Sequence, residues 1–361
     1  MSLTIAILGA SGAVGSSLST NILRSDLLEP FDRIQLVGHG EANSTGRLSA
    51  ICMDLLDAFD DHRVIVDVLP DISESNADLV VMAAGVALPP GSVDRREMGR
   101  ANLPVFQHAA GLCAQYLPDA SYIIVSNPVE LAVKSFSDVI NRKQILGMGA
   151  EQDSLRFARS IARGLGVSRH EISAGVWGEH GRNMVPIWSS ARVRSRDSGK
   201  INALDELRAK AASLPLAERV SQLQSQVQAS LASGDLQKAY QFAEQSLPDA
   251  RIFIEPFITA TAIHSTPNAT ANAVLNCLRA WKADDDRLLH AQVSLNGELK
   301  DRVGVFGVPV RFGPAGWELD ESCEHLNAIE EQQVEDSFHA VQAYLDELTK
   351  NPEQAPTMSV V

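Results

Sequence analysis

A short apolar run near the start of the chain leads directly into three regularly spaced glycines. The run reads TIAIL and continues as GASGAVGSS. A strand that turns sharply into a helix needs bare side chains at such positions, because a pyrophosphate must approach the backbone amides of the new helix. The order of strand, turn and helix favours this interpretation over its alternative, a glycine-rich turn with only a structural role. The predicted dinucleotide-binding residues of this turn are Gly9, Gly12, Ala13, Val14 and Gly15.

Short β-branched runs alternate with helical patterns through the first 148 residues. The runs after TIAIL are RIQLV, VIVDV, DLVVMAAG, ASYIIVSN and QILGMG. Such alternation is typical of a parallel sheet covered by helices. Six strands is also the number expected of a doubly wound dinucleotide-binding domain. We therefore predict an α/β domain of this kind over residues 1–148.

The order of elements changes after this domain, which predicts a second, α+β catalytic domain over residues 149–350. This domain contains a helical insertion around residues 196–248. One helical stripe in the insertion is formed by Leu216, Val220, Leu223, Val227 and Leu231. A helix that packs on the body through this stripe is favoured over an arm that binds a partner. Residues 351–361 are expected to form a frayed tail.

The second predicted strand, RIQLV, ends in Gly38 and His39, where dinucleotide-binding domains usually carry an acidic residue. That acid binds the hydroxyls of the adenosine ribose and favours NAD over NADP. With no carboxylate at the strand tip, groups such as His39, Ser44 or Arg47 could accept a 2′-phosphate. Glu41 or a backbone group could equally bind the ribose of NAD. The cofactor is therefore predicted to be NAD or NADP, with Gly38 and His39 in its site.

The formal net charge of -14 argues against several classes of partner. An acidic excess without any run of Lys and Arg repels nucleic acids and anionic membranes, and no stretch approaches a membrane span. The four cysteines have neither metal-ligand spacing nor a disulfide pattern, which is typical of a reducing cytoplasm. We expect a cytoplasmic protein that acts on a small molecule, without a metal, a nucleic acid or a membrane partner.

His180 is the candidate group for moving a proton. It lies in GVWGEHG, where flanking glycines allow the backbone to bring an imidazole into a cleft. Reduction of a carbonyl by a nicotinamide needs a proton at the oxygen, and histidine supplies one near neutral pH. A lone histidine is more often structural, so it needs partners. Asp153 and Arg156 project from one helix face and could provide them, although such a pair could also be an ordinary surface salt bridge.

Together these motifs resemble the lactate and malate dehydrogenases over nearly the whole chain. The resemblance rests on GASGAVGSS, AAGVALPPG, VSNPVE, DSLRFAR and GEHGRNMVP. It implies that Asp153 pairs with the catalytic His180 and that Arg156 binds the substrate carboxylate. It further implies that Asn127 contacts the substrate and the ribose next to the nicotinamide, and this residue can also form an Asx turn before proline. The family resemblance implies a homodimer or homotetramer.

The loop GVALPPGSVDRREM contains both a match to this family and a departure from it. A loop arginine in the family polarises the substrate carbonyl as the loop closes. Arg95 best fits that position, and Arg96 is its alternative. The substrate-selecting position is normally arginine for malate or glutamine for lactate, whereas this chain has Leu88, Pro89 and Pro90. A second carboxylate would lack a cationic partner there, which favours a monocarboxylic or apolar 2-oxo acid.

Three segments leave alternatives open. The glycine turn and the segment GVPVRF are closer to the malate branch, in disagreement with the loop. In AIHSTPNATANA, Ser265 and Thr266 lie where the family lines its substrate pocket with small hydroxylated residues. Either residue could instead cap a helix that begins with Pro267.

The sequence thus predicts an NAD(P)-dependent 2-hydroxy acid dehydrogenase, which transfers a hydride between the cofactor and a 2-hydroxy or 2-oxo carboxylic acid. One alternative is an NAD-requiring glycosidase, but that class needs a metal held by cysteine and histidine, and no cysteine lies beside His180. Another is a dinucleotide-binding regulator that has lost catalysis through its altered loop. The presence of Asp153, Arg156 and His180 argues against this second alternative.

Overall fold

The computed structural model of this chain describes residues 2–39, 42–86, 95–263, 265–285 and 287–350. Its strands are β1 (Thr4–Leu8), β2 (Arg33–Val37), β3 (Ile65–Leu69), β4 (Leu79–Met82), β5 (Ser121–Ile124), β6 (Ile145–Gly147), β7 (Ile172–Gly178), β8 (Met184–Val193), β9 (Leu289–Asn296), β10 (Val303–Gly313) and β11 (Gly316–Leu319). Its α-helices are α1 (Ala13–Arg24), α2 (Ala42–Phe59), α3 (Arg95–Tyr116), α4 (Val129–Ser137), α5 (Gly149–Leu165), α6 (Ser198–Ala212), α7 (Leu216–Ala232), α8 (Leu236–Gln245), α9 (Pro248–Ile263), α10 (Pro267–Ala283) and α11 (Ala328–Lys350).

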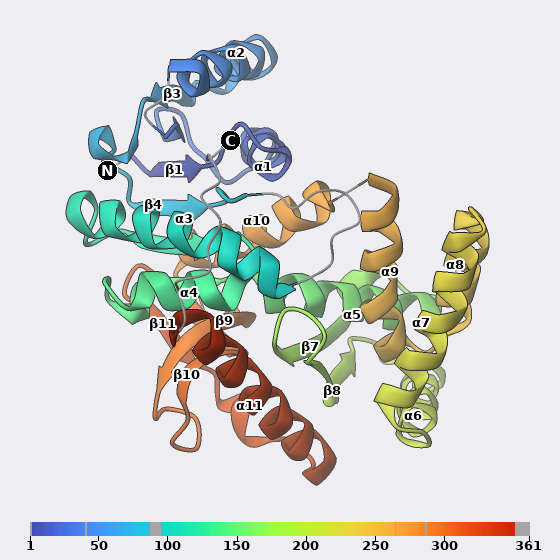
Figure 1. Cartoon of the computed structure of the whole chain (residues 1–361). Coiled ribbons are helices and arrows are strands. Elements are labelled where there is room, and N and C mark those ends of the chain that lie inside the picture. Colours follow the sequence, from blue (N-terminus) through green and yellow to red (C-terminus); the bar gives the residue numbers. More distant parts are fainter. Residues whose placement is uncertain (1, 40–41, 87–94, 264, 286, 351–361) are drawn as a thin grey trace.

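The first six strands form a parallel sheet in the order β3-β2-β1-β4-β5-β6. This is the doubly wound order of dinucleotide-binding folds. Strands β1 and β4 are buried along their whole length, because helices cover both faces of such a sheet. Figure 1 shows α1, α2 and α3 around the strands of this half. The α/β fold class predicted from the alternation of strands and helices is confirmed.

Three strands of the second half extend the same sheet. Strands β9, β10 and β11 continue it in antiparallel fashion beyond β6, so that the sheet has nine strands, and Gly147 pairs with Gln292 at the junction. Helix α10 also reaches the first half, where Trp281 donates its indole N–H to Ser121 Oγ of β5 at 2.8 Å. The predicted domain boundary after residue 148 falls between β6 and α5. It stays a prediction, because sheet and core run across it.

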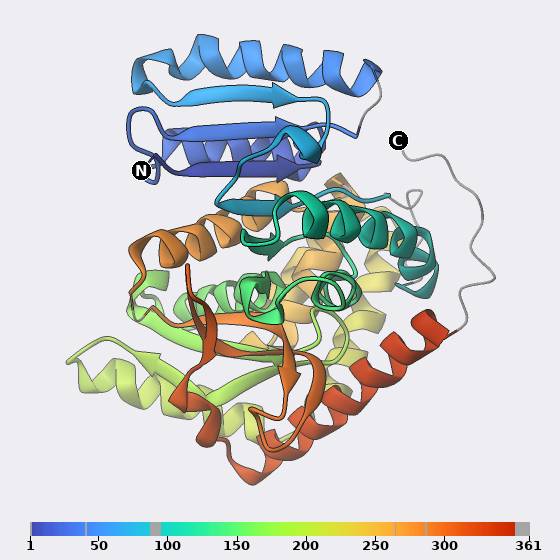
Figure 2. The same cartoon turned by 90° about the vertical axis from the view of Figure 1, so that its left-hand side faces the viewer.

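A separate antiparallel pair, β7 and β8, carries the GVWGEHG segment. Strand β7 packs against α5, and its last residue, Gly178, lies two positions before His180. An irregularity in register between Ser173 and Gly175 bends this pair. The long helix α11 runs along the outside of the molecule, as the red helix of Figure 2 shows.

The helical insertion packs on the body through its apolar stripe. Leu223 and Val227 of α7 are buried against residues of α8 and α9, among them Ala239 and Ile254. Helices α7 and α8 lie at the periphery, with α9 between them and the rest of the molecule (Figure 1), whereas α6 packs directly on α5 and β8. The packed helix was the favoured interpretation of the stripe, and the structure agrees with it.

Asp249 at the start of α9 ties the insertion to the catalytic half. Both of its carboxylate oxygens accept hydrogen bonds from Arg219 of α7, at 2.6 and 2.8 Å. One of them also accepts the indole N–H of Trp188 in β8 at 2.9 Å. The side chains of Asp249 and Arg219 are 2% and 11% exposed, so this ion pair is buried. Loss of one partner would leave a charge without compensation.

The four cysteines are free thiols and all are buried. In the part of the chain that the structure describes, no helix combines the length and the apolar character needed to cross a membrane.

Candidate active site

The glycine turn that joins β1 to α1 packs so closely against neighbouring backbone that it leaves little space for side chains. Gly9 has a φ of 83°, a left-handed conformation that favours glycine, and a Cβ there would lie 2.6 Å from the backbone N of Ala84. Gly15 is buried under the turn, where a Cβ would lie 2.3 Å from the carbonyl O of Gly9. Gly12 caps α1, and its N–H donates to that same carbonyl at 3.0 Å. Gly12 and Ala13 are exposed, so the unpaired amides of the first helical turn can receive a phosphate.

The other predicted cofactor residues lie around this turn. Val14 is half-buried and packs against the core. Gly38 follows β2, and its N–H donates to the carbonyl O of Leu69 at 2.9 Å. A Cβ at Gly38 would lie 2.8 Å from the carbonyl O of Pro70, so this backbone leaves no room there for the usual acidic side chain. His39, next in the chain, is exposed. The turn therefore fits a dinucleotide, and the ribose end lacks a carboxylate at Gly38.

Asp153 lies between the two other predicted catalytic groups. Its Oδ2 is 2.6 Å from His180 Nδ1, and its Oδ1 accepts a hydrogen bond from Arg156 Nη1 at 2.9 Å. Asp153 is 2% exposed, whereas the side chains of His180 and Arg156 are 16% and 17% exposed. The structure thus brings together three residues from two segments of the chain, as the sequence predicts.

The electrostatics of Asp153 favour its charged form. Burial by itself would raise the pKa of this carboxyl group. The charge and hydrogen bond of His180, together with those of Arg156, outweigh burial and leave the pKa below its usual value. An ionised Asp153 can only accept hydrogen bonds, so His180 must carry a proton on Nδ1. Nε2 of His180 is then the atom that can exchange a proton with a substrate.

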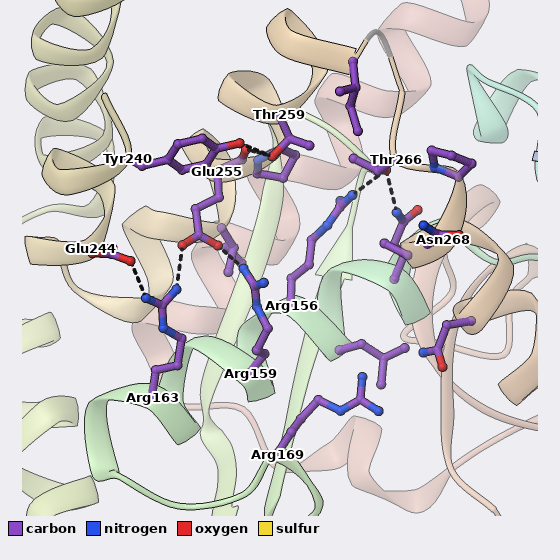
Figure 3. Close-up of a pocket in the computed structure, with 18 residues that line it drawn as sticks. Arg156, Arg159, Arg163, Arg169, Tyr240, Glu244, Glu255, Thr259, Thr266 and Asn268 are labelled. Atoms are coloured by element: carbon purple, nitrogen blue, oxygen red, sulfur yellow. Dashed lines mark hydrogen bonds and ion pairs between the residues drawn. The ribbon is translucent and has the colours of Figure 1, made fainter. Parts of the chain in front are cut away.

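Thr266 is at the N-cap position of α10, with Pro267 following it, but its side chain makes no capping hydrogen bond. Its Oγ1 instead accepts hydrogen bonds from Arg156 Nη2 and from Gln152 Nε2, each at 3.3 Å. Figure 3 shows Arg156 extending from α5 toward Thr266. Thr266 therefore occupies the N-cap position without capping the helix through its side chain, and its hydroxyl is directed at Arg156. Its role in lining the substrate pocket stays a prediction. Ser265 is half-buried beside it.

Asn127 is exposed at the end of the segment that follows β5, and the peptide bond to Pro128 is cis. Gln292 of β9, which sequence reasoning missed, lies between the two catalytic segments. Its Oε1 accepts the N–H of Ala150 at 3.1 Å, and its Nε2 donates to the carbonyl O of Gly178 at 3.3 Å. Gln292 thereby fixes the start of α5 against the end of β7.

Arg95 is the first residue of α3 and does not contact Arg156. Its Nη2 donates to Glu130 Oε2 at 2.7 Å, and its Nη1 donates to the carbonyl O of His180 at 2.7 Å. Nη1 also lies 2.9 Å from Glu179 Oε1. The polarising role that the resemblance implies for Arg95 stays a prediction.

Arg96, the alternative to Arg95, is largely exposed, and its Nε lies 3.0 Å from Glu347 Oε2. Residues Leu88, Pro89 and Pro90, to which the choice of substrate was assigned, lie outside the described residues.

Glu130 of α4 is the largest omission from the predicted site. Its side chain is 1% exposed, and its Oε1 accepts the backbone N–H of His180 at 2.6 Å. Burial raises the pKa of the Glu130 carboxyl group, and Arg95 and the His180 N–H act against that rise. A single acidic residue in the otherwise apolar run VELAV was the available signal, because a buried charge needs a partner.

No group of three or more His, Cys, Asp or Glu residues that could hold a metal ion occurs within the described ranges.

Comparison with family models gives matches across most of the chain. The model of the lactate/malate dehydrogenase NAD binding domain matches residues 3–147. The model of the lactate/malate dehydrogenase alpha/beta C-terminal domain matches residues 151–230.

Similar proteins include a 2-hydroxycarboxylate dehydrogenase and malate dehydrogenases. L-2-hydroxycarboxylate dehydrogenase (NAD(P)(+)) of Methanocaldococcus jannaschii is 26% identical over 328 residues, which cover 89% of this chain and 91% of that protein. Malate dehydrogenase of Trichormus variabilis is 27% identical over 348 residues, covering 95% and 93%. The crystal structure of Cryptosporidium parvum malate dehydrogenase is similar in fold, with a TM-score of 0.72 and 20% identity, over 97% of this chain and 100% of the other.

Proposed function

Because the chain belongs to the lactate/malate dehydrogenase family and is an NAD(P)-dependent oxidoreductase of 2-hydroxy acids, we propose that His180 exchanges the proton at the substrate oxygen. The observation that carries this proposal is the position of Asp153, which holds the imidazole with one oxygen and Arg156 with the other. A proton-transfer group and a carboxylate-binding group thus lie on either side of one buried anion. A 2-oxo acid has its carbonyl and its carboxylate on adjacent carbons, so it can engage both.

In the reducing direction, His180 begins as an imidazolium that Asp153 stabilises. A bound nicotinamide would supply the hydride at the carbonyl carbon. Nε2 of His180 gives its proton to the carbonyl oxygen, which becomes the hydroxyl group of the product. His180 is then neutral, with its remaining proton on Nδ1 facing Asp153. In the oxidising direction the same Nε2 accepts the hydroxyl proton.

Arg156 would bind the carboxylate of the substrate. A guanidinium group has five N–H donors, and the hydrogen bonds to Asp153 and Thr266 occupy one each of Nη1 and Nη2. Donors therefore remain for a carboxylate, and the planar group suits two parallel hydrogen bonds. Asn127, exposed after β5, is proposed to contact the substrate and the ribose next to the nicotinamide.

A cavity of about 480 Å³ adjoins Arg156 and Thr266 and suggests the class of substrate side chain. It lies between α5, α9 and the start of α10 (Figure 3). Its wall includes Leu155, Ile252 and Ile263. Two of its further arginines are paired, Arg159 with Glu255 and Arg163 with both Glu244 and Glu255, and Arg169 also lines the cavity. We infer that 2-oxo acids with a branched or extended apolar side chain are favoured over pyruvate.

The proposed cofactor preference is a relaxed one, in which NADPH is accepted as well as NADH. It is supported by the lack of space for a carboxylate at Gly38 and by Ser44, whose Oγ lies 3.2 Å from the position of a Cβ there. His39 and Arg47 are exposed nearby in the sequence and could meet a 2′-phosphate. We expect kcat/KM for NADPH and kcat/KM for NADH to be nearly equal. A preference of about a thousandfold for NADH would refute the proposal.

The deciding experiment is a panel of oxaloacetate, pyruvate, 2-oxoisocaproate and 2-oxohexanoate, each with NADH and NADPH. We expect turnover that is fastest with the two longer apolar acids. Fastest turnover with oxaloacetate would instead favour the malate branch, to which the glycine turn is similar. No transfer of deuterium from labelled nicotinamide to any acid would favour the regulatory alternative.

Two properties of the intact protein are also proposed. The family resemblance supports a homodimer or homotetramer, which light scattering on the purified chain measures directly. The free cysteines support a cytoplasmic location. Fractionation of the source cells with an antibody to the protein tests this location.

A further inference from the structure

A closed ring of hydrogen bonds surrounds the backbone of His180. The N–H of His180 donates to Glu130 Oε1 at 2.6 Å. Glu130 Oε2 accepts from Arg95 Nη2 at 2.7 Å, and Arg95 Nη1 donates to the carbonyl O of His180 at 2.7 Å. Both polar groups of one residue are therefore held by a single ion pair. We refer to Glu130 and Arg95 together as the backbone clamp.

The clamp is fixed from outside by two other residues. Tyr344 of α11 donates its hydroxyl to the carbonyl O of Arg95 at 2.9 Å, and its ring centre lies 5.5 Å from the guanidinium carbon. Glu179 Oε1 lies 2.9 Å from Arg95 Nη1. The side chains of Glu130 and Glu179 are 1% and 7% exposed. Any movement of Arg95 is therefore costly, because it would leave both nearly buried carboxylates without the positive charge that compensates them.

The glycine after His180 is required for this arrangement. A Cβ at Gly181 would lie 1.8 Å from Arg95 Nη1, so any side chain there would displace the guanidinium group. Gly149 has the corresponding role on the imidazole side, where a Cβ would lie 2.6 Å from Cβ and Cγ of His180. The chain thus keeps space for the clamp on one side of His180 and for its ring on the other.

We propose that Glu130 and Arg95 are positioning residues, which hold the backbone of His180 so that its Nε2 meets the substrate oxygen. This inference rests on the role proposed for His180. It gives Arg95 a different task from polarising the substrate carbonyl. Asp153 contacts the imidazole at one atom only, Nδ1, and so leaves the ring able to pivot about that contact. The clamp removes this freedom by fixing the main chain from which the side chain projects.

The size of the effect follows from the sensitivity of proton transfer to geometry. A displacement of about 1 Å in a reacting group can lower the rate by about a hundredfold. The substrate carboxylate binds to Arg156, which the clamp does not touch. Loss of the clamp should therefore lower kcat and leave KM for the 2-oxo acid within about threefold of the wild type.

A double-mutant cycle tests the inference on the intact protein with its best 2-oxo acid. Glu130→Gln and Arg95→Gln should each lower kcat by about a hundredfold. The kcat of the double variant should be no lower than that of the less active single variant. Such non-additivity is expected when two residues act through one third residue. Arg95→Lys, which keeps one charged donor, should restore part of the loss. Arg100→Gln is the matched control on the same helix, because the side chain of Arg100 is 42% exposed and pairs with Glu347 outside the clamp; it should change kcat by less than about twofold.

Two results would overturn the inference. One is full activity of Glu130→Gln. The other is a loss in Arg95→Gln that multiplies with that of Glu130→Gln, because multiplication would mean that Arg95 touches the substrate. Should Glu130→Gln fail to fold in thermal unfolding, Gly181→Ala displaces Arg95 without removing a charge and should lower kcat by a similar factor. Inactivity of the wild type toward every 2-oxo acid would refute the proposed function instead, so the two failures are distinguishable.

Discussion

Replacement of Asp153 by asparagine removes the anion that holds both His180 and Arg156 while almost preserving its shape. The oxygen that faces His180 is 2.6 Å from Nδ1, which puts the centres of charge about 4 Å apart. At an effective dielectric constant of about 20, two unit charges at that separation attract by about 4 kcal/mol. Each 1.4 kcal/mol corresponds to about tenfold, so loss of this attraction should slow proton transfer by about a thousandfold.

Steady-state kinetics of 2-oxo acid reduction measures this effect. We expect kcat/KM of Asp153→Asn to fall by about a thousandfold at pH 8, with part of the loss in KM because Arg156 also loses its partner. Binding of NADH, which depends on the glycine turn, should stay within about threefold of the wild type.

Asp138→Asn is the matched control, because Asp138 is 57% exposed and paired with Lys134 on the surface of α4. It should leave kcat/KM within about twofold of the wild type. A deficit in kcat/KM of Asp153→Asn smaller than about tenfold would refute the electrostatic reasoning and leave Asp153 with a purely structural role.

Three further changes test other parts of the structure. Gly15→Ala places a Cβ 2.3 Å from the carbonyl O of Gly9 and should weaken NADH binding more than tenfold in calorimetry. Gly12→Ala places its Cβ 3.3 Å from the same atom and should weaken binding less. Equal losses of affinity in the two variants would contradict the steric argument. Asp249→Ala leaves Arg219 buried and unpaired and should lower the free energy of urea unfolding by about 3 kcal/mol. A loss below about 1 kcal/mol would mean that contacts other than this ion pair hold the insertion on the body. Burial alone would raise the pKa of Glu298, but hydrogen bonds to its carboxylate outweigh burial and lower the pKa to about 2. The stability that Glu298 contributes should therefore be complete above pH 4.5 and disappear as the pH falls through 2. A Glu298→Gln variant whose deficit in unfolding free energy does not shrink over this interval would disprove that coupling.

The parts of the fold that sequence predicts best are those with local causes. The strand, turn and helix at the glycines follow from steric needs within fifteen residues, and the parallel order follows from repeated alternation. Asp153 and Arg156 are three positions apart on one helix, so their common direction is also local. The family resemblance then connected this pair with His180, which is distant in sequence.

Long-range contacts between residues of ordinary type were not predictable in the same way. Glu130 lies 35 positions from Arg95 and 50 from His180, and no spacing rule links them. The family resemblance indicated a loop arginine at Arg95, but only the fold shows that two buried carboxylates lie within reach of its guanidinium group. The joining of β9 to β6 was likewise hidden, because it depends on one pairing between Gly147 and Gln292.

The sheet that runs from β3 to β11 limits how this enzyme can be recombined with its relatives. Exchange of the first 148 residues for those of a relative with another cofactor would cut between β6 and α5, yet α10 packs on α1 and bonds to β5 from the far side of that cut. A chimera with that junction would place a foreign surface under Trp281. Grafts intended to change cofactor choice should therefore carry α10 with them, or stay within the segment from β2 to α2.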